Sequence, residues 1–170
     1  MKRIVLFVAL LPVFASAQKS YHYAFFGAET FSGSKESTRY GVSTSFGWGI
    51  NKFMTLGFGG SGYLIDDGYR YGTVRLDATY FILGIDQKVT PLVSLQPGYV
   101  IAPKTGYLDR YNNQQIKTGA ACLEVLGGVK TNFYKHVGIY AAAGYSVTQF
   151  KMVHGYFNDA GFKAKVGISL

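Results

Sequence analysis

Apolar and polar residues alternate with period two along most of this 170-residue chain. A period of two is typical of β-strands, because successive side chains of a strand point to opposite faces of the sheet. In residues 38–50, Tyr40, Trp48 and Ile50 share a bulky apolar face, and small or polar residues occupy the other face. The alternation predicts eight strands, at residues 19–31, 38–50, 53–65, 71–83, 89–102, 116–131, 137–151 and 160–170.

The last predicted strand raises the question of which face meets water. Phe162 and Ile168 lie on its apolar face, whereas Lys163 and Lys165 lie on the other. A soluble strand turns its charges toward water, but in a membrane only helices and closed barrels satisfy every backbone polar group. A barrel of eight strands is narrow enough for side chains to fill. We therefore expect an all-β, eight-stranded antiparallel up-and-down transmembrane β-barrel, with Lys163 and Lys165 pointing inward.

The predicted connections alternate in length. Those after the second, fourth and sixth strands are short, at 51–52, 84–88 and 132–136, and the others tend to be longer and more polar, notably 103–115. Short turns at one end and long loops at the other are typical of transmembrane barrels. Because the number of strands is even, we expect both termini on the short-turn side, which is the periplasm.

Aromatic residues gather near the ends of the predicted strands. In a transmembrane barrel such residues form girdles at the two membrane–water interfaces. The expected turn-side girdle is Phe46, Trp48, Phe53, Phe133 and Tyr134, and the expected loop-side girdle is Tyr40, Tyr63, Tyr69 and Tyr71.

Two strands depart from the simple pattern. In the first, Tyr23 and Phe25 compete with their neighbours for the outer face, so its orientation stays open. In the fifth, Pro91 and Pro97 each remove a backbone donor from the sheet. We expect a bulge or locally weak pairing there.

Residues 1–17 have the pattern of a cleavable signal peptide. Lys2 and Arg3 form a basic start, and residues 4–14 are an apolar run too short to span a bilayer. Small residues up to Ala17 then fit the cleavage pattern. We therefore divide the chain into a signal peptide at 1–17 and an outer-membrane β-barrel domain at 18–170.

Charge and cysteine content narrow the choice of partners. Loss of Lys2 and Arg3 lowers the basic residues from 17 to 15, against 9 acidic ones, and the net charge from +8 to +6. On an exported protein this excess favours anionic lipid headgroups over nucleic acid. Cys122 is the single cysteine, which excludes an intramolecular disulfide. We expect it to be a small interior filler.

The alternation turns six charged side chains into the barrel, three of each sign. They can neutralise one another, as charges buried away from water require. We expect a polar plug that fills the barrel, and the alternative is a gate or relay for a small solute. The predicted charge network is Glu29, Arg75, Asp77, Glu124, Lys163 and Lys165.

The longest predicted loop is basic and aromatic, with Asp109 as its single acid. Charge-assisted hydrogen bonds from such a loop can bind lipopolysaccharide phosphates or a surface partner. The plainer interpretation is a solvated loop that faces the headgroups. The candidate contact residues are Lys104, Tyr107, Arg110, Tyr111 and Lys117.

Patterns for catalysis and metal binding are weak. An acyl-modifying enzyme would need a Ser or an acid beside a His on the rim. We expect His22 and His136 on the periplasmic side, which leaves His154 near the outer rim with Asp159 as a weak partner. The dispersed histidines and Cys122 show no metal-ligand spacing. We predict no enzyme activity, metal or cofactor, and a lipid-modifying enzyme that uses His154 is an alternative.

The signal peptide, alternating strands, tight turns, larger loops and C-terminal strand together resemble small eight-stranded outer-membrane β-barrel proteins, of the OmpA membrane domain and OmpX type. The resemblance covers about residues 19–170 and is architectural. It implies an outer-membrane location in a Gram-negative envelope, contact with outer-membrane lipids, and recognition by the barrel assembly machinery. Members usually end in an aromatic residue, whereas this chain ends in Leu170.

A structural or surface-interaction role is the function that we expect, with no extracellular partner indicated. One alternative is a narrow, porin-like pore or transporter for a small or hydrophobic solute. Another is a soluble eight-stranded carrier of the lipocalin kind, because Gly47, Trp48 and Gly49 match its aromatic signature superficially. Such carriers keep their apolar face inside, around a ligand, which is the reverse of the pattern described above.

Overall fold

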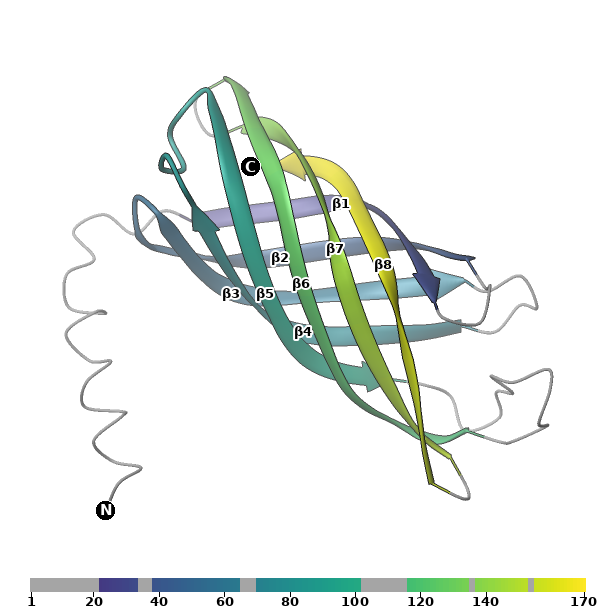
Figure 1. Ribbon diagram of the computed structural model, residues 1–170. Helices are drawn as coiled ribbons and strands as arrows, with labels where there is room; N and C mark the ends of the chain where they lie inside the picture. The colour runs from purple at the N-terminus through teal and green to yellow at the C-terminus, as the bar shows by residue number, and fades with distance from the viewer. Residues whose placement is uncertain (1–21, 34–37, 65–69, 102–115, 135–136, 153–154) are drawn as a thin grey trace, which may run out of the picture.

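The computed structural model describes residues 22–33, 38–64, 70–101, 116–134, 137–152 and 155–170. They form one antiparallel sheet that closes on itself in the order β1 to β8 (Figure 1), which confirms the predicted eight-stranded up-and-down barrel. Within the described residues, no helix is long and apolar enough to cross a membrane. The strands are β1 (His22–Gly33), β2 (Thr38–Asn51), β3 (Met54–Leu64), β4 (Arg70–Phe81), β5 (Val89–Ile101), β6 (Ile116–Tyr134), β7 (Val137–Met152) and β8 (Gly155–Ser169).

The two ends of the barrel are named here by their connections. Residues 52–53, 82–88 and 135–136 connect strands at the turn end, where β1 starts and β8 finishes. The opposite end is the loop end. Its connections are 34–37, 65–69, 102–115 and 153–154.

Pairing of β1 with β8 closes the sheet. The register places Phe25 opposite Ser169. Next to that pair, Ala24 N donates to Leu170 O at 3.1 Å, and Leu170 N donates to Ala24 O at 2.9 Å. The first and last strands therefore satisfy each other's backbone groups over this length, which is what β-structure in hydrocarbon requires.

The two faces of the sheet differ in the way that the alternation predicts. Large apolar side chains stand on the outer face, such as Phe26, Phe58 and Val166, which are 65%, 60% and 54% exposed. Lys163 and Lys165 lie inside, at 0% and 5% exposure. An apolar outer surface of this extent is unfavourable in water and suits a lipid bilayer. In β1, Tyr23 and Phe25 point inward, which settles the orientation that the sequence left open.

Three residues expected on the outer face lie inside. A register shift between Gly49 and Asn51 turns Ile50 inward, where it is 8% exposed. The assignment of Tyr63 and Tyr71 to the loop-side girdle is also wrong, because both are buried and their rings stack with centroids 4.7 Å apart. Each of the two tyrosines lies two residues along its strand from an inward polar residue and therefore points to the same inner face. This alternation outweighs the preference of tyrosine for the membrane–water interface.

Weak pairing occurs in β5, as expected, but without a bulge. The ladder between β4 and β5 skips Leu76 and Asp77, which lie opposite Pro97 and Gln96, and resumes in the same register. Pro97 has no N–H to donate, which accounts for the gap. The described register shifts fall instead between β2 and β3 and between β6 and β7.

The hairpin of β7 and β8 is longer than predicted. β8 begins at Gly155 instead of residue 160, so residues 153–154 alone separate it from β7, and the expected long connection after the seventh strand is wrong. Gln149 Nε2 donates to Asn158 Oδ1 across the two strands at 3.0 Å. Asn158 and Asp159 are polar and do not continue the apolar alternation, so they resemble loop residues in sequence. Partners on neighbouring strands hold them in β8.

An inward glycine of β3 allows its neighbours to approach closely. A Cβ at Gly57 would lie 2.1 Å from Phe46 O and 2.7 Å from Tyr23 Oη. At the outward Gly62, in contrast, nothing lies within 4 Å of the Cβ position. The close packing of the barrel wall therefore requires a glycine at the first position and not at the second.

We predict that Gly57→Ala lowers the free energy of unfolding by about 1–3 kcal/mol, because the added methyl group overpacks the wall. Gly62→Ala is the matched control, and we expect no loss there, since alanine removes the entropic cost of glycine without a clash. Urea unfolding of the barrel in lipid vesicles measures both variants. Equal losses in the two would contradict the orientation of β3.

Candidate functional site: the barrel interior

Three layers of side chains fill the barrel interior. Aromatic residues and an ion pair lie toward the loop end, a charge network occupies the middle, and an apolar plug lies toward the turn end. Because the strands of a barrel are tilted against its axis, each layer collects side chains from strands that are far apart in sequence.

Glu124, on β6, is the centre of the charge network. Its Oε1 lies 2.6 Å from Lys163 Nζ and 3.5 Å from Arg75 Nη1. Its Oε2 lies 2.8 Å from Lys165 Nζ. Glu124 is 1% exposed, so these contacts replace the water that a carboxylate would otherwise need.

Glu29, on β1, meets the same three cations. Its Oε1 lies 3.1 Å from Lys163 Nζ, and its Oε2 lies 3.5 Å from Lys165 Nζ and 3.8 Å from Arg75 Nη2. The β1–β8 register places Glu29 directly opposite Lys165, a favourable cross-strand pair. Each cation therefore lies between two carboxylates, and five of the six predicted residues form one ionic cluster.

Asp77, the sixth predicted residue, is linked to the cluster through neutral side chains. Its Oδ1 accepts hydrogen bonds from Thr79 Oγ1 at 2.9 Å and from Ser94 Oγ at 3.1 Å. Gln96 Nε2 donates to Ser94 Oγ at 2.9 Å, and Lys165 Nζ donates to Gln96 Oε1 at 2.6 Å. Within the described residues Asp77 forms no ion pair, so it ends a hydrogen-bonded relay that starts at Lys165.

The layer toward the loop end contains a buried ion pair that the sequence analysis misses. Arg39 of β2 pairs with Asp159 of β8 and donates from Nη1 to Tyr71 Oη at 3.3 Å. The Arg39 guanidinium also lies 5.2 Å from the centroid of the Phe31 ring, a cation–π distance. Lys163 donates to the hydroxyl of Tyr63, which connects this layer to the charge network.

The alternation along each strand indicates that the missed charged residues point inward. Arg39 is in phase with the inward Ser43, and Asp159 is in phase with the inward Lys163. Lys130 of β6 is likewise buried, with its Nζ 5.8 Å from the centroid of the Phe81 ring. Arg39 and Lys130 already lie on the inner face of the predicted strands at 38–50 and 116–131, and starting the last strand at Gly155 instead of residue 160 would have added Asp159.

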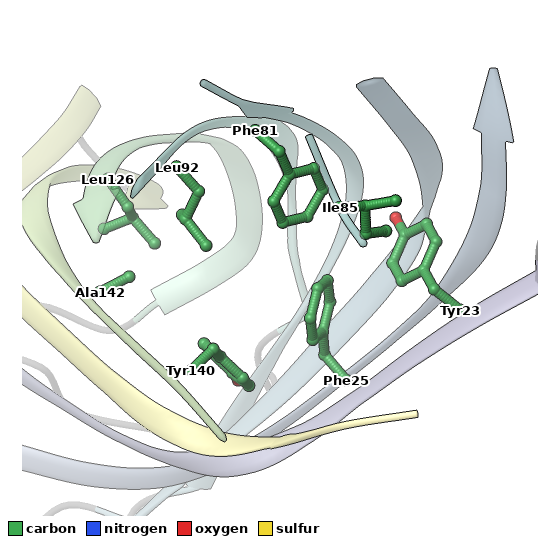
Figure 2. Close-up of a cluster of buried hydrophobic side chains, with 8 residues drawn as sticks. All are labelled: Tyr23, Phe25, Phe81, Ile85, Leu92, Leu126, Tyr140 and Ala142. Atoms are coloured by element: carbon green, nitrogen blue, oxygen red, sulfur yellow. The ribbon is translucent and has the colours of Figure 1, made fainter. Parts of the chain in front are cut away.

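The apolar plug closes the turn end of the barrel. Phe25 and Tyr140 meet edge to face, with ring centroids 4.9 Å apart. The connection after β4 brings Ile85 into the plug, because Ile85 N donates to Lys52 O at 2.8 Å and Asn132 Nδ2 donates to Ile85 O at 2.9 Å. Figure 2 shows the plug residues Tyr23, Phe25, Phe81, Ile85, Leu92, Leu126, Tyr140 and Ala142.

The structure describes less of the remaining candidate residues. His154, on which the enzyme alternative depends, lies outside the described residues, as does His136. Cys122 is a free thiol buried in the interior at 4% exposure. Among the described residues, no group of three His, Cys, Asp or Glu side chains is placed to hold a metal ion. Of the candidate loop residues, Lys117 lies in β6 without a described side chain, and the others lie outside the description: Lys104, Tyr107, Arg110 and Tyr111.

A closed eight-stranded barrel with an apolar outer face and a filled interior has the fold of small outer-membrane β-barrel proteins. Among solved structures, the chain is similar to Neisserial surface protein A (NspA), with a TM-score of 0.69 and 17% identity over 90% of this chain and 99% of NspA. It is also similar to the N-terminal β-barrel domain of OprF from Pseudomonas aeruginosa, with a TM-score of 0.54 and 18% identity over 90% of this chain and 98% of that domain. No protein-family model and no curated protein sequence matches the chain. At these identities the similarity concerns the fold.

We predict that Glu124→Ala lowers the free energy of unfolding by about 3–5 kcal/mol, because it leaves buried cations facing a single carboxylate. Lys151→Ala removes an exposed charge from β7 and serves as the control, with an expected loss below about 1 kcal/mol. Urea unfolding in lipid vesicles compares the two. A loss for Glu124→Ala no larger than the loss for the control would show that the network does not stabilise the barrel.

Proposed function

We propose that this chain is an exported outer-membrane β-barrel with a structural or surface-interaction role, that its interior is closed to solutes, and that it is not an enzyme. The filled interior is the observation that carries this proposal. The proposal includes a signal peptide at 1–17 and a barrel domain at 18–170. Those first residues lie outside the described chain, so the signal peptide stays a prediction from sequence.

The apolar outer face supports a location in the membrane. Burying such a face in acyl chains is favourable, and the closed sheet leaves its backbone groups satisfied there. The likeness to NspA and to the OprF barrel supports the outer membrane in particular. Contact with outer-membrane lipids and insertion by the barrel assembly machinery follow from that location.

Long strands on one side of the barrel support a surface role. A transmembrane strand needs about 9–11 residues; β3 has 11, whereas β6, β7 and β8 have 19, 16 and 15. In Figure 1, β7 and β8 reach past the loop-end tips of β3 and β4. This extension exposes polar and aromatic groups such as Lys151, Tyr156 and Asn158. Binding of lipopolysaccharide phosphates by the loop after β5, through Lys104 and Arg110, remains a prediction from sequence.

Two barriers in series support a closed interior. The charge network holds its side chains by short ionic contacts to Glu124 and Glu29 in the middle of the barrel. The plug places apolar side chains between that network and the turn end. A hydrated solute would have to break the ionic contacts and also cross an apolar constriction, so opening one barrier leaves the other in place.

We predict that the mature protein in planar lipid bilayers gives no stable conductance steps, and that Glu124→Ala gives none either, because the plug still closes the turn end. A general porin in the same bilayer is the positive control. Steps in the wild type, or a clear rise in Glu124→Ala, would contradict the closed barrel. That result would favour the narrow pore or transporter, with the charge network as its gate.

A further inference from the structure

A small cavity lies between the charge network and the apolar plug. Its volume is about 30 Å³. Arg75, Asp77 and Lys165 contribute to its polar side, and Leu92 and Ala142 to its apolar side. All of its lining residues are buried. We call this cavity the chamber.

The size of the chamber limits what it can hold. A cavity needs roughly 10–15 Å³ of volume open to the centre of a water molecule to hold one water, so the chamber has room for about two. Figure 2 shows Leu92, Leu126 and Ala142 on one side of the barrel interior and Phe25 on the other, with Tyr140, from the same strand as Ala142, drawn between them. A wholly apolar cavity of this kind stays dry, whereas a polar one of sufficient size takes up water.

The chemistry of Asp77 makes the chamber polar. Both hydrogen bonds that this carboxylate accepts from described residues, from Thr79 and Ser94, fall on Oδ1. Asp77 is 2% exposed, lines the chamber and forms no ion pair within the described chain, and no described side chain donates a hydrogen bond to its Oδ2. A buried carboxylate oxygen in that position is costly unless a donor reaches it.

The charge balance around the chamber decides the class of ligand. The ionic cluster has three cations and two carboxylates, and Asp77 supplies the missing negative charge. A cation or an anion in the chamber would leave a net charge in a medium of low dielectric constant. The ligand must therefore be neutral, small and able to donate a hydrogen bond.

We propose that the chamber is a binding site for ordered water, about two molecules, which donate to Asp77 and complete its hydrogen bonding. This site goes beyond the proposed function and holds whether or not the barrel binds a surface partner. It assigns Asp77 a role distinct from that of the ionic cluster. Its carboxylate balances the one excess positive charge of the ionic cluster across a hydrated chamber, without direct contact between the charged groups.

A crystal structure of the mature protein, at a resolution that shows ordered water, tests the proposal. The expected result is density for water inside the chamber, within hydrogen-bond distance of Asp77. In Ala142→Val, whose larger side chain occupies the chamber, that density should be lost. Absence of density in the wild type, or density within contact distance of apolar side chains alone, would overturn the proposal.

Stability provides a second measurement that needs no crystals. Filling a dry cavity stabilises a protein, whereas displacing water that satisfies a buried carboxylate destabilises it. We expect the urea midpoint of Ala142→Val to fall below that of the wild type. Ala143→Val, on the outer face of the same strand, is the matched control and should keep the wild-type midpoint. A higher midpoint for Ala142→Val than for the wild type would mean that the chamber is dry.

Discussion

The pairing of β1 with β8 is the constraint on which the rest of the structure depends. It removes the free edges that a sheet cannot expose to hydrocarbon, and it creates the enclosed interior. It also places Glu29 opposite Lys165 and Phe31 opposite Lys163. The charge network therefore follows from topology, because its members come from β1, β4, β6 and β8 and meet only when the sheet is closed.

Charge pairing in the interior also specifies the register. Buried ion pairs add little stability over well-packed apolar residues, but removal of one partner is costly. A slip of β8 by one residue would turn Lys163 and Lys165 into the lipid and Val166 into the barrel. The two lysines therefore make the shifted register unfavourable. The plug around Leu126 supplies apolar packing at the turn end.

The sequence was sufficient to predict the strand number and the inward direction of residues such as Glu29, because lipid and interior impose opposite polarity on alternate positions. It did not predict strand ends, since Asn158 and Asp159 are held by partners across the sheet. Ile50 was misplaced because a register shift changes the parity locally. The separation of Asp77 from the ionic cluster depends on strand tilt and stagger, which alternation does not encode.

The central claim is that alternate residues of each strand face lipid and a closed interior. Methyl NMR of the barrel in nanodiscs that contain lipid with a paramagnetic acyl chain tests it most directly. The account predicts strong broadening for the methyl groups of Leu123 and Ala143, on the outer face, and weak broadening for Leu126 and Ala142 on the same two strands. Equal broadening within each pair, or the reverse order, would contradict it.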